Sequence, residues 1–319
     1  MTKGAPPKRL VVALGGNAIL QPGEKGTFEE QDANVLKTCR QIAKILKKGH
    51  EVVITHGNGP QVGNILIQNE RSGDVVPSMP LDVCGSESQG FIGYMIQNNM
   101  NRAMAEEGIH RDVATVVTQV VVDPKDPAFD APTKPVGPFY DSKTAASKMK
   151  ERGERWVEDS GRGWRKVVPS PDPLDIVEKQ VIKVLLEAGI LVVACGGGGI
   201  PVVAEGGAYR GVEAVIDKDL AAERLASMIR ADMLLILTDV PRVCLNYRQP
   251  GQMELGQVTV KEARDFMNQG HFKAGSMKPK VQAAIRFVES GGKAAIISSL
   301  GAVLDAIDGL EGTRVVPGI

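Results

Sequence analysis

The sequence predicts an α/β fold in which a mostly parallel β-sheet is covered by helices on both faces. Short, continuous apolar runs alternate along the chain with segments whose apolar residues recur at helical spacing, and this alternation is typical of parallel sheets. Three of the apolar runs end in glycine clusters, which suits turns at one edge of such a sheet. The length of 319 residues allows one large domain or two lobes.

The first part of the chain contains two strands and two helix starts. The first strand is expected over residues 10–14, an apolar run that stops at Gly15-Gly16. The following helix begins at a capping box formed by Thr27 and Glu30 and ends near Gly49. A second strand is expected over 51–55, and Pro60 behind it suits the first turn of another helix.

The last part of the chain repeats the pattern after a less regular middle. Gly189 ends one expected helix, and Thr259 with Glu262 forms a second capping box. The expected strands cover 190–195, 233–237 and 293–297, and the expected helices cover 173–188, 219–230 and 280–289.

Residues 123–168 differ from the rest of the chain. They are rich in Pro, Lys, Arg and Asp, lack a long apolar period, and hold both tryptophans, Trp156 and Trp164. This composition indicates an inserted hairpin or small lid within a single domain that spans 1–319. A solvated surface excursion is the alternative interpretation.

Composition excludes several classes of function. The 38 Lys plus Arg balance the 38 Asp plus Glu, which argues against a general nucleic-acid binder. No apolar run reaches the roughly 18 residues of a membrane span, and the N-terminus has no signal-peptide pattern. Four scattered cysteines indicate a reduced, cytoplasmic protein, and the spacing of Cys and His predicts no metal site. Aromatic residues make up only 4% of the chain, so the core must be aliphatic.

The glycine clusters favour an anion site at the carboxyl ends of the strands. Glycine lets backbone N–H groups approach an anion, and a helix N-terminus adds partial positive charge. Neither the Walker A pattern nor GxGxxG occurs at a strand–helix turn, so a phosphate site of another design remains and a nicotinamide oxidoreductase is disfavoured. An ordinary tight turn is the alternative for any single cluster.

Three lysines stand in turns beside these clusters. Lys134 is flanked by prolines, Lys218 lies between two aspartates at a helix start, and Lys280 lies where a turn enters a helix. Phosphoryl transfer needs such positive charge, although each lysine alone could be a surface residue. His56 lies at a strand end and could contact a substrate, but the favoured interpretation is a hydrogen-bonded turn residue.

Seven segments together resemble the carbamate kinases, a group within the amino-acid kinase family. They are ALGGNAI (13–19), THGNGPQVG (55–63), PTKPVGPFY (132–140), ACGGGGIPV (194–202), VIDKDLAAERLA (215–226), LTDVPRVCLNY (237–247) and GSMKPKVQAAIRF (275–287). The resemblance runs from Leu10 to the C-terminus. It implies a three-layer αβα sandwich on a mainly parallel sheet of about eight strands, with a small protruding subdomain.

The resemblance also implies an activity. Members catalyse the reversible reaction ATP plus carbamate gives ADP plus carbamoyl phosphate, with Mg²⁺. The reaction commonly makes ATP at the end of arginine or agmatine breakdown, and members are usually cytoplasmic homodimers. No partnership with nucleic acid or membrane is expected.

Site roles follow from the same resemblance, position by position. The catalytic set is Lys134, Lys218, Asp219 and Lys280, in which Asp219 organises the lysines and Lys134 reaches over the phosphoryl group. The substrate and phosphoryl loops are Gly15, Gly16, Asn17, Gly57, Asn58, Gly59, Gly196 and Gly197. The adenine-nucleoside pocket is formed by Thr238, Asp239, Val240, Val243, Tyr247 and Met277.

One departure sharpens the choice within the family. Many members carry a Lys two residues before the first Gly-Gly, whereas this chain has Ala13. The missing charge must come from elsewhere, and Lys134 is the candidate, which favours carbamate over larger acceptors. A kinase for another small acid and a non-catalytic nucleotide or anion sensor are the remaining alternatives.

Overall fold

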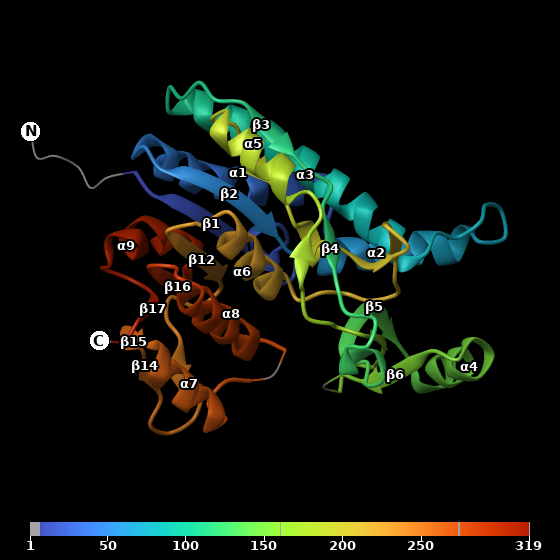
Figure 1. The fold of residues 1–319 in the computed structure, drawn as a ribbon. Helices are drawn as coiled ribbons and strands as arrows, with labels where there is room; N and C mark the ends of the chain where they lie inside the picture. Colours follow the sequence, from blue (N-terminus) through green and yellow to red (C-terminus); the bar gives the residue numbers. More distant parts are fainter. Residues whose placement is uncertain (1–6, 160, 274, 319) are drawn as a thin grey trace, which may run out of the picture.

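The computed structural model describes residues 7–159, 161–273 and 275–318, and a twisted sheet runs through its centre (Figure 1). Within these residues, the main sheet has eight strands: β1 (Arg9–Leu14), β2 (Glu51–His56), β3 (Val113–Thr115), β9 (Leu191–Val193), β12 (Met233–Thr238), β15 (Gln257–Thr259), β16 (Ala294–Ser299) and β17 (Thr313–Val316). Their order is β15-β17-β16-β12-β1-β2-β9-β3, and every neighbouring pair is parallel except β16 with β17. The mainly parallel sheet of about eight strands is therefore confirmed.

Side chains alternate between the two faces of this sheet, as strand geometry requires. Leu10, Val12 and Leu14 of β1 pack on one side, whereas Val11 and Ala13 pack on the other. The first side is covered by α1 (Phe28–Lys47), α3 (Leu81–Glu106) and α9 (Val303–Asp308), and the second by α5 (Lys179–Glu187), α6 (Lys218–Met228), α7 (Val260–Asn268) and α8 (Met277–Glu289). This arrangement confirms the three-layer αβα sandwich.

Smaller sheets accompany the main sheet. A second sheet has the order β11-β10-β4-β8, and a two-stranded ribbon pairs β13 with β14. The bounds are β4 (Gln119–Val121), β8 (Asp175–Ile176), β10 (Ile200–Glu205), β11 (Ala208–Gly211), β13 (Cys244–Leu245) and β14 (Met253–Glu254), with short helices η1 (Gly16–Ala18), η2 (Pro127–Phe129), η3 (Gly196–Gly198) and η4 (Leu300–Ala302).

Residues 134–168 form a unit that projects from the main body, drawn in green in Figure 1, and are called the subdomain below. They fold into an antiparallel sheet of order β5-β7-β6 and one helix. The elements are β5 (Lys134–Tyr140), α4 (Ser142–Arg152), β6 (Arg155–Glu158) and β7 (Trp164–Val168). The strand β5 packs along α2 (Gly59–Ser72), the helix that follows the second glycine cluster.

Both predicted capping boxes are present, at Thr27 with Glu30 and at Thr259 with Glu262. The helix expected over 173–188 is partly wrong, because α5 begins only at Lys179. Backbone bonds from Leu174 to Val121 and from Val177 to Gln119 pull the preceding residues into a strand beside β4. The strand expected over 190–195 ends early, since Cys195 adopts a left-handed conformation with φ of 52°. The helix α3 was not predicted at all.

All four cysteines are free thiols, and burial raises the pKa of Cys39 and Cys195 well above the usual range. Among the described residues, no helix combines the length and apolarity needed to cross a membrane.

Candidate active site

The three glycine loops meet at the carboxyl edge of the main sheet. They follow β1, β2 and β9, which are mutually parallel, so the expected shared edge is confirmed. The loops are in close contact: a Cβ on Gly57 would lie 3.2 Å from the Lys218 Cδ and 3.8 Å from the Gly16 nitrogen. The backbone of the first two loops and a lysine of α6 therefore enclose one small volume.

The third loop approaches the second at Gly197. Its φ is +66°, and a Cβ there would lie 2.1 Å from the Nδ2 of Asn58, so only glycine fits without a shift. Asn58 in turn donates a hydrogen bond to Ser88 Oγ at 2.8 Å. Gly196 does not line this cavity, and a Cβ on it would lie 2.5 Å from Nε2 of the His56 ring.

Asp219 holds two of the predicted lysines at the start of α6. Lys218 Nζ lies 2.6 Å from one carboxylate oxygen, and Lys280 Nζ lies 2.8 Å from the other. Burial alone would raise the pKa of Asp219, but the two ammonium groups outweigh it and hold that pKa well below its usual range. Burial lowers the pKa of Lys218, and Asp219 opposes this effect. The result is a compact cluster with one more cation than anion.

The third lysine reaches the cluster from the subdomain. Lys134, the first residue of β5, lies with its Nζ 2.8 Å from Asp217 Oδ2. The other oxygen of Asp217 accepts the backbone N–H of Asp219 at 2.9 Å and caps α6. Sequence reasoning assigned no role to Asp217, although its place before Lys218 at a helix start is a capping signal.

Three adjoining cavities, with volumes of about 270, 500 and 700 Å³, run along this edge and share lining residues. The first is lined by nine of the predicted residues: Gly16, Gly57, Asn58, Gly59, Lys134, Gly197, Lys218, Asp219 and Lys280. Gly15 and Asn17 line the second, together with Lys218 and Lys280. Ser276 lines all three, so the cavities form one continuous path.

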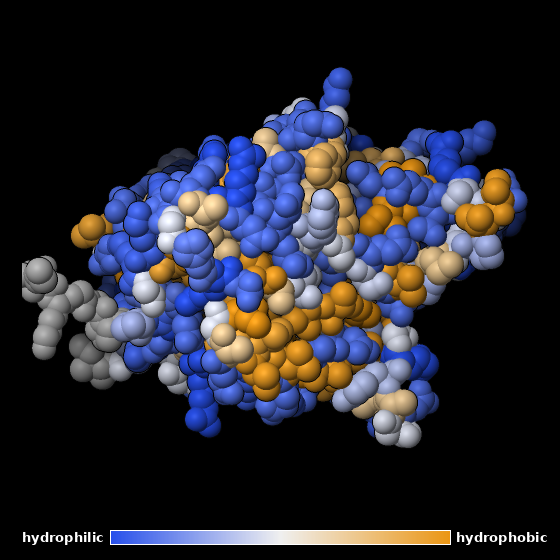
Figure 2. Space-filling model, turned by 90° about the horizontal axis from the view of Figure 1, so that it is seen from above, coloured by the Kyte–Doolittle hydropathy of each residue, from blue (hydrophilic) through white to orange (hydrophobic). Residues whose placement is uncertain are grey.

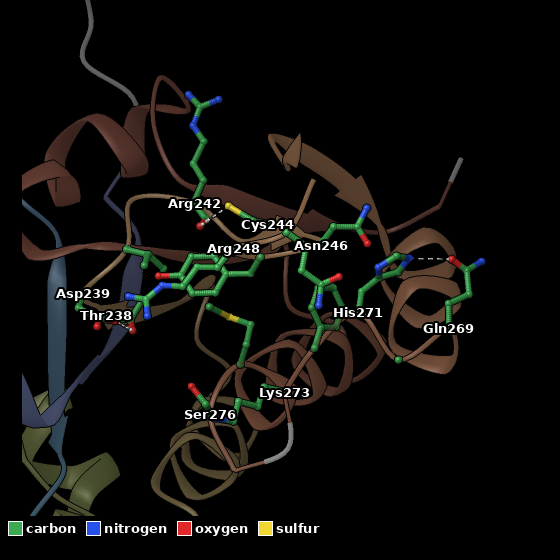
Figure 3. Close-up of a pocket in the computed structure, with 16 residues that line it drawn as sticks. Thr238, Asp239, Arg242, Cys244, Asn246, Arg248, Gln269, His271, Lys273 and Ser276 are labelled. Carbon is green, nitrogen blue, oxygen red and sulfur yellow. Dashed lines mark hydrogen bonds between the residues drawn. The ribbon is translucent and has the colours of Figure 1, made fainter. Parts of the chain in front are cut away.

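The largest cavity lies between the end of β12 and the start of α8, and Figure 3 shows its side chains. Five of the six residues predicted for the nucleoside line it, namely Thr238, Asp239, Val240, Tyr247 and Met277. Val243 does not, because it is 1% exposed and packs in the core. Sequence reasoning missed Arg248, whose guanidinium lies 5.2 Å from the centre of the Tyr247 ring, and also Lys273. The cavity thus combines an aromatic wall with cations.

His56 is a buried turn residue. Its Nδ1 lies 2.9 Å from the carbonyl oxygen of Gly57, and only 1% of the residue is exposed. Burial lowers the pKa of His56 to about 4 and outweighs the opposing hydrogen bond to Gly57. Since a carbonyl can only accept, Nδ1 carries the proton of the neutral ring. This confirms the structural interpretation of His56 and leaves it outside the described lining of the cavities.

The arrangement can bind a polyanion and stabilise charge that moves along it. Three lysines, a helix N-terminus and glycine amides face one path, and the path opens into a pocket large enough for a nucleoside. Fixed donors of this kind are what phosphoryl transfer requires, because charge spreads over the oxygens of the moving group.

Comparisons with known proteins agree with this geometry. Residues 8–299 match the family model described as the amino acid kinase family. The chain is 55% identical over 315 residues to a carbamate kinase of Pyrococcus horikoshii, which covers 98% of this chain and 100% of that protein. A carbamate kinase of Trichomonas vaginalis is 52% identical over 97% of this chain and 99% of its own length.

Solved structures show the same relationship. A carbamate kinase from Giardia lamblia bound to AMP-PNP superposes with a TM-score of 0.93 at 48% identity, covering 98% of this chain and 99% of that one. The fold, the site and these relatives lead to one conclusion. The chain is a phosphotransferase that belongs to the amino acid kinase family, where it stands among the carbamate kinases.

Proposed function

We propose that this protein catalyses the reversible transfer of a phosphoryl group between ATP and carbamate, giving ADP and carbamoyl phosphate. The observation that carries the proposal is Asp219 holding Lys218 and Lys280 at the junction of the cavities. The names of the relatives support the acceptor, and the AMP-PNP complex of the Giardia enzyme supports an adenine nucleotide.

The nucleoside is proposed to occupy the pocket of Figure 3, with its phosphates directed toward Lys218 and Lys280. The transferring phosphoryl group would lie at Gly15, Gly16 and Asn17, and carbamate at the loop of residues 57–59. Because the carbamate oxygen is already anionic, the residues need to position two anions and neutralise them rather than remove a proton.

Lys134 is proposed to supply the charge that Ala13 lacks. It comes from the start of β5 in the subdomain, lines the cavity, and its ammonium lies 2.8 Å from Asp217. A bound phosphoryl group would offer a second anion at this place. The small volume of about 270 Å³ suits an acceptor as small as carbamate.

Mg²⁺ is proposed to arrive with the nucleotide. In the described ranges, no three His, Cys, Asp or Glu side chains gather in a group that could hold a metal ion, and both oxygens of Asp219 hold lysines. These residues do not fit a resident magnesium site. Mg²⁺ commonly binds substrate phosphates and keeps several waters, so it would neutralise the phosphates as part of the substrate.

We also propose a homodimer. Figure 2 shows an apolar area on the face that carries α3, β3 and α5. The exposed apolar side chains of these elements include Phe91, Tyr94, Val181 and Val184, and Val117 follows the edge strand β3. Contiguous apolar surface of this kind typically marks an interface.

In the cell, we propose cytoplasmic ATP synthesis at the end of arginine or agmatine breakdown.

The direct test is ATP formation from ADP, Mg²⁺ and carbamoyl phosphate, coupled to hexokinase. Rapid ATP formation is expected, with acetyl phosphate a much poorer donor because its methyl group has no N–H donors in place of the carbamoyl amino group. Tight nucleotide binding with no ATP formed would contradict the proposal and indicate a sensor. Faster turnover with acetyl phosphate would indicate another acceptor.

A further inference from the structure

A single carboxylate of the main body gathers three side chains of the subdomain. Glu70, near the end of α2, accepts a hydrogen bond from Tyr140 Oη at 3.0 Å and forms ion pairs with Lys148 and with Arg152, the latter at 3.3 Å. Tyr140 ends β5, and the two cations lie on α4. These four residues are called the Glu70 cluster below.

The cluster is supported by aromatic packing. The rings of Tyr140 and Trp156 meet edge to face at 5.3 Å, and the Lys148 ammonium lies 5.1 Å from the Tyr140 centroid. Burial alone would raise the pKa of Glu70, but the bonds to Lys148 and Tyr140 outweigh it and lower the pKa. Glu70 is therefore ionised at neutral pH, and its partners are held in defined positions.

The cluster and the candidate active site lie at opposite ends of the same two elements. The strand β5 begins with Lys134 in the site and ends with Tyr140 in the cluster, a length of about 20 Å for seven residues of strand. The helix α2 begins beside the loop of residues 57–59 and carries Glu70 in its last turns. Midway, a Cβ on Gly63 would lie 3.6 Å from the Gly137 Cα, so helix and strand touch along their backbones.

Between its ends, β5 is irregular. Its pairing with β7 shifts register between Val136 and Tyr140, and Gly137 has φ of +72°. Such a break in the ladder bends a strand. The contacts of Tyr140 with Glu70 are therefore a second attachment of β5, on the other side of the bend from Lys134.

We propose that Glu70 is a positioning residue for the phosphoryl-transfer reaction: it fixes the subdomain against α2 so that Lys134 reaches the reacting group. Glu70 itself does not line the described cavities of the site. The inference rests on the proposed function and on the role of Lys134. It predicts an effect on turnover rather than on nucleotide binding, because the nucleoside pocket lies on the other side of the site.

The test measures kcat and the KM for ADP of Glu70→Gln and Glu70→Ala in the ATP-forming assay. Glu70→Gln keeps the shape and the bond to Tyr140, so a loss of severalfold in kcat is expected, with about tenfold for Glu70→Ala and less than a twofold change in the KM for ADP. Glu106→Ala is the matched control, since Glu106 likewise pairs with two cationic side chains, those of Arg40 and Arg102, and both lie outside the subdomain. Its kcat should be unchanged.

A double-mutant cycle separates positioning from a general loss of structure. In a Lys134→Ala background, Glu70→Ala should lower kcat by less than twofold, because the group that it positions is already gone. Full additivity of the two losses, or an unchanged kcat in Glu70→Ala, would overturn the inference. If Glu70→Ala does not fold, Lys148→Met breaks the same ion pair from the subdomain side and retains packing on Tyr140, and the same outcomes apply.

Failure of the proposed function gives a different result. If the wild-type protein forms no ATP from carbamoyl phosphate, the proposed function is wrong, whatever the result for Glu70. If the wild type forms ATP, Lys134→Ala loses most of its kcat and Glu70→Ala keeps its kcat, the proposed function stands and only the positioning role of Glu70 is rejected.

Discussion

The carboxylates of the site each hold cations that a substrate would compete for. Asp219 is 3% exposed at its side chain and binds two lysines, while Asp217 binds Lys134 and also caps α6. The two aspartates therefore have different partners: Asp219 pairs with Lys218 and Lys280, and Asp217 pairs with Lys134 from the subdomain. Removing a lysine leaves the cap of α6 intact, because Asp217 makes it by accepting the backbone N–H of Asp219.

Replacing Lys134 tests this division. Lys134→Ala should lower kcat by about 10²- to 10³-fold, the typical loss when one fixed donor to a transition-state anion is removed. The fold should survive because Lys134 is 30% exposed at its side chain and Asp217 still caps α6. Coupled ATP-formation kinetics and circular dichroism check both statements, with Lys143→Ala on the exposed surface of α4 as the control. Near-wild-type turnover would exclude the role of Lys134.

His56 gives a pH dependence of stability. Its pKa of about 4 in the folded protein lies below the unfolded value near 6.5, so the unfolded chain binds more protons between these values. Stability from this residue is complete above about pH 6.5 and falls as the pH drops toward 4. At pH 5 the loss amounts to about 2 kcal/mol.

Urea unfolding at pH 7.5 and pH 5 measures this effect. The glutamine side chain in His56→Gln cannot titrate. The free energy of unfolding should therefore fall between pH 7.5 and pH 5 by about 2 kcal/mol less in this variant than in the wild type. His110→Gln, at an exposed histidine, should keep the wild-type difference. Equal pH dependence in wild type and His56→Gln would contradict the assignment.

At the scale of elements, the turn after β9 fixes the distance between two loops. Gly197→Ala adds a Cβ at a φ of +66° and 2.1 Å from Asn58 Nδ2, so Asn58 must leave its bond to Ser88. We expect kcat/KM for carbamoyl phosphate to fall at least tenfold, because the loop proposed for carbamate shifts.

The matched control for this variant is Gly206→Ala in the β10–β11 turn. Gly206 also has a positive φ, +59°, but nothing lies within 4 Å of its added Cβ. Both variants should lose about 1 kcal/mol of stability from backbone strain. Only Gly197→Ala should lose activity, and equal kinetics in the two variants would show that the contact with Asn58 is unimportant.

Elements with strong local signals were predictable from sequence. The strands near 10–14, 51–55 and 233–237 are buried on both faces and read as continuous apolar runs, and the capping boxes mark two helix starts. The helix α3 escaped prediction because glycines, serines and asparagines interrupt its apolar residues. One of these glycines, Gly93, lies where a Cβ would meet Thr115 of β3, so tertiary packing dictates its presence.

The sequence predicted those parts of the site whose residues are close together along the chain. It did not predict contacts between residues that are far apart in the sequence. The glycine loops and Lys218 with Asp219 carry short motifs, and the structure brings them together. The pairs Lys134–Asp217 and Lys148–Glu70 join residues 83 and 78 positions apart, for which one sequence has no local signal. Five of the six residues predicted for the nucleoside line the largest cavity, whereas Val243 was wrongly included because its side chain is buried in the core, which the sequence does not reveal.

At the scale of the whole molecule, one end of the main sheet lies beside α3, where the Gln97 side chain donates to the Val113 carbonyl and accepts from the Thr115 N–H of β3. The strand β3 ends the order of the sheet, and α3 and α5 flank it on opposite faces. The exposed apolar side chains of α3 and α5 beside this end of the sheet favour association with another chain. A two-fold axis near β3 would bring the same patch of two chains together and bury Tyr94 and Val184, which are now 61% and 62% exposed.

Light scattering after size exclusion tests this dimer. The wild type should elute with twice the chain mass of 34.0 kDa, and Tyr94→Glu with Val184→Glu should shift it toward one chain mass, because two buried, unpaired carboxylates per protomer oppose association. Met253→Glu, at a side chain 53% exposed on β14 and outside the patch, should keep the wild-type mass. Since Lys134, Lys218, Asp219 and Lys280 of one chain line the same cavity, the monomeric double variant should retain ATP formation per chain. A wild type that elutes with one chain mass would contradict the dimer. A dimer that persists with both patch substitutions would mean that the chains associate through another face.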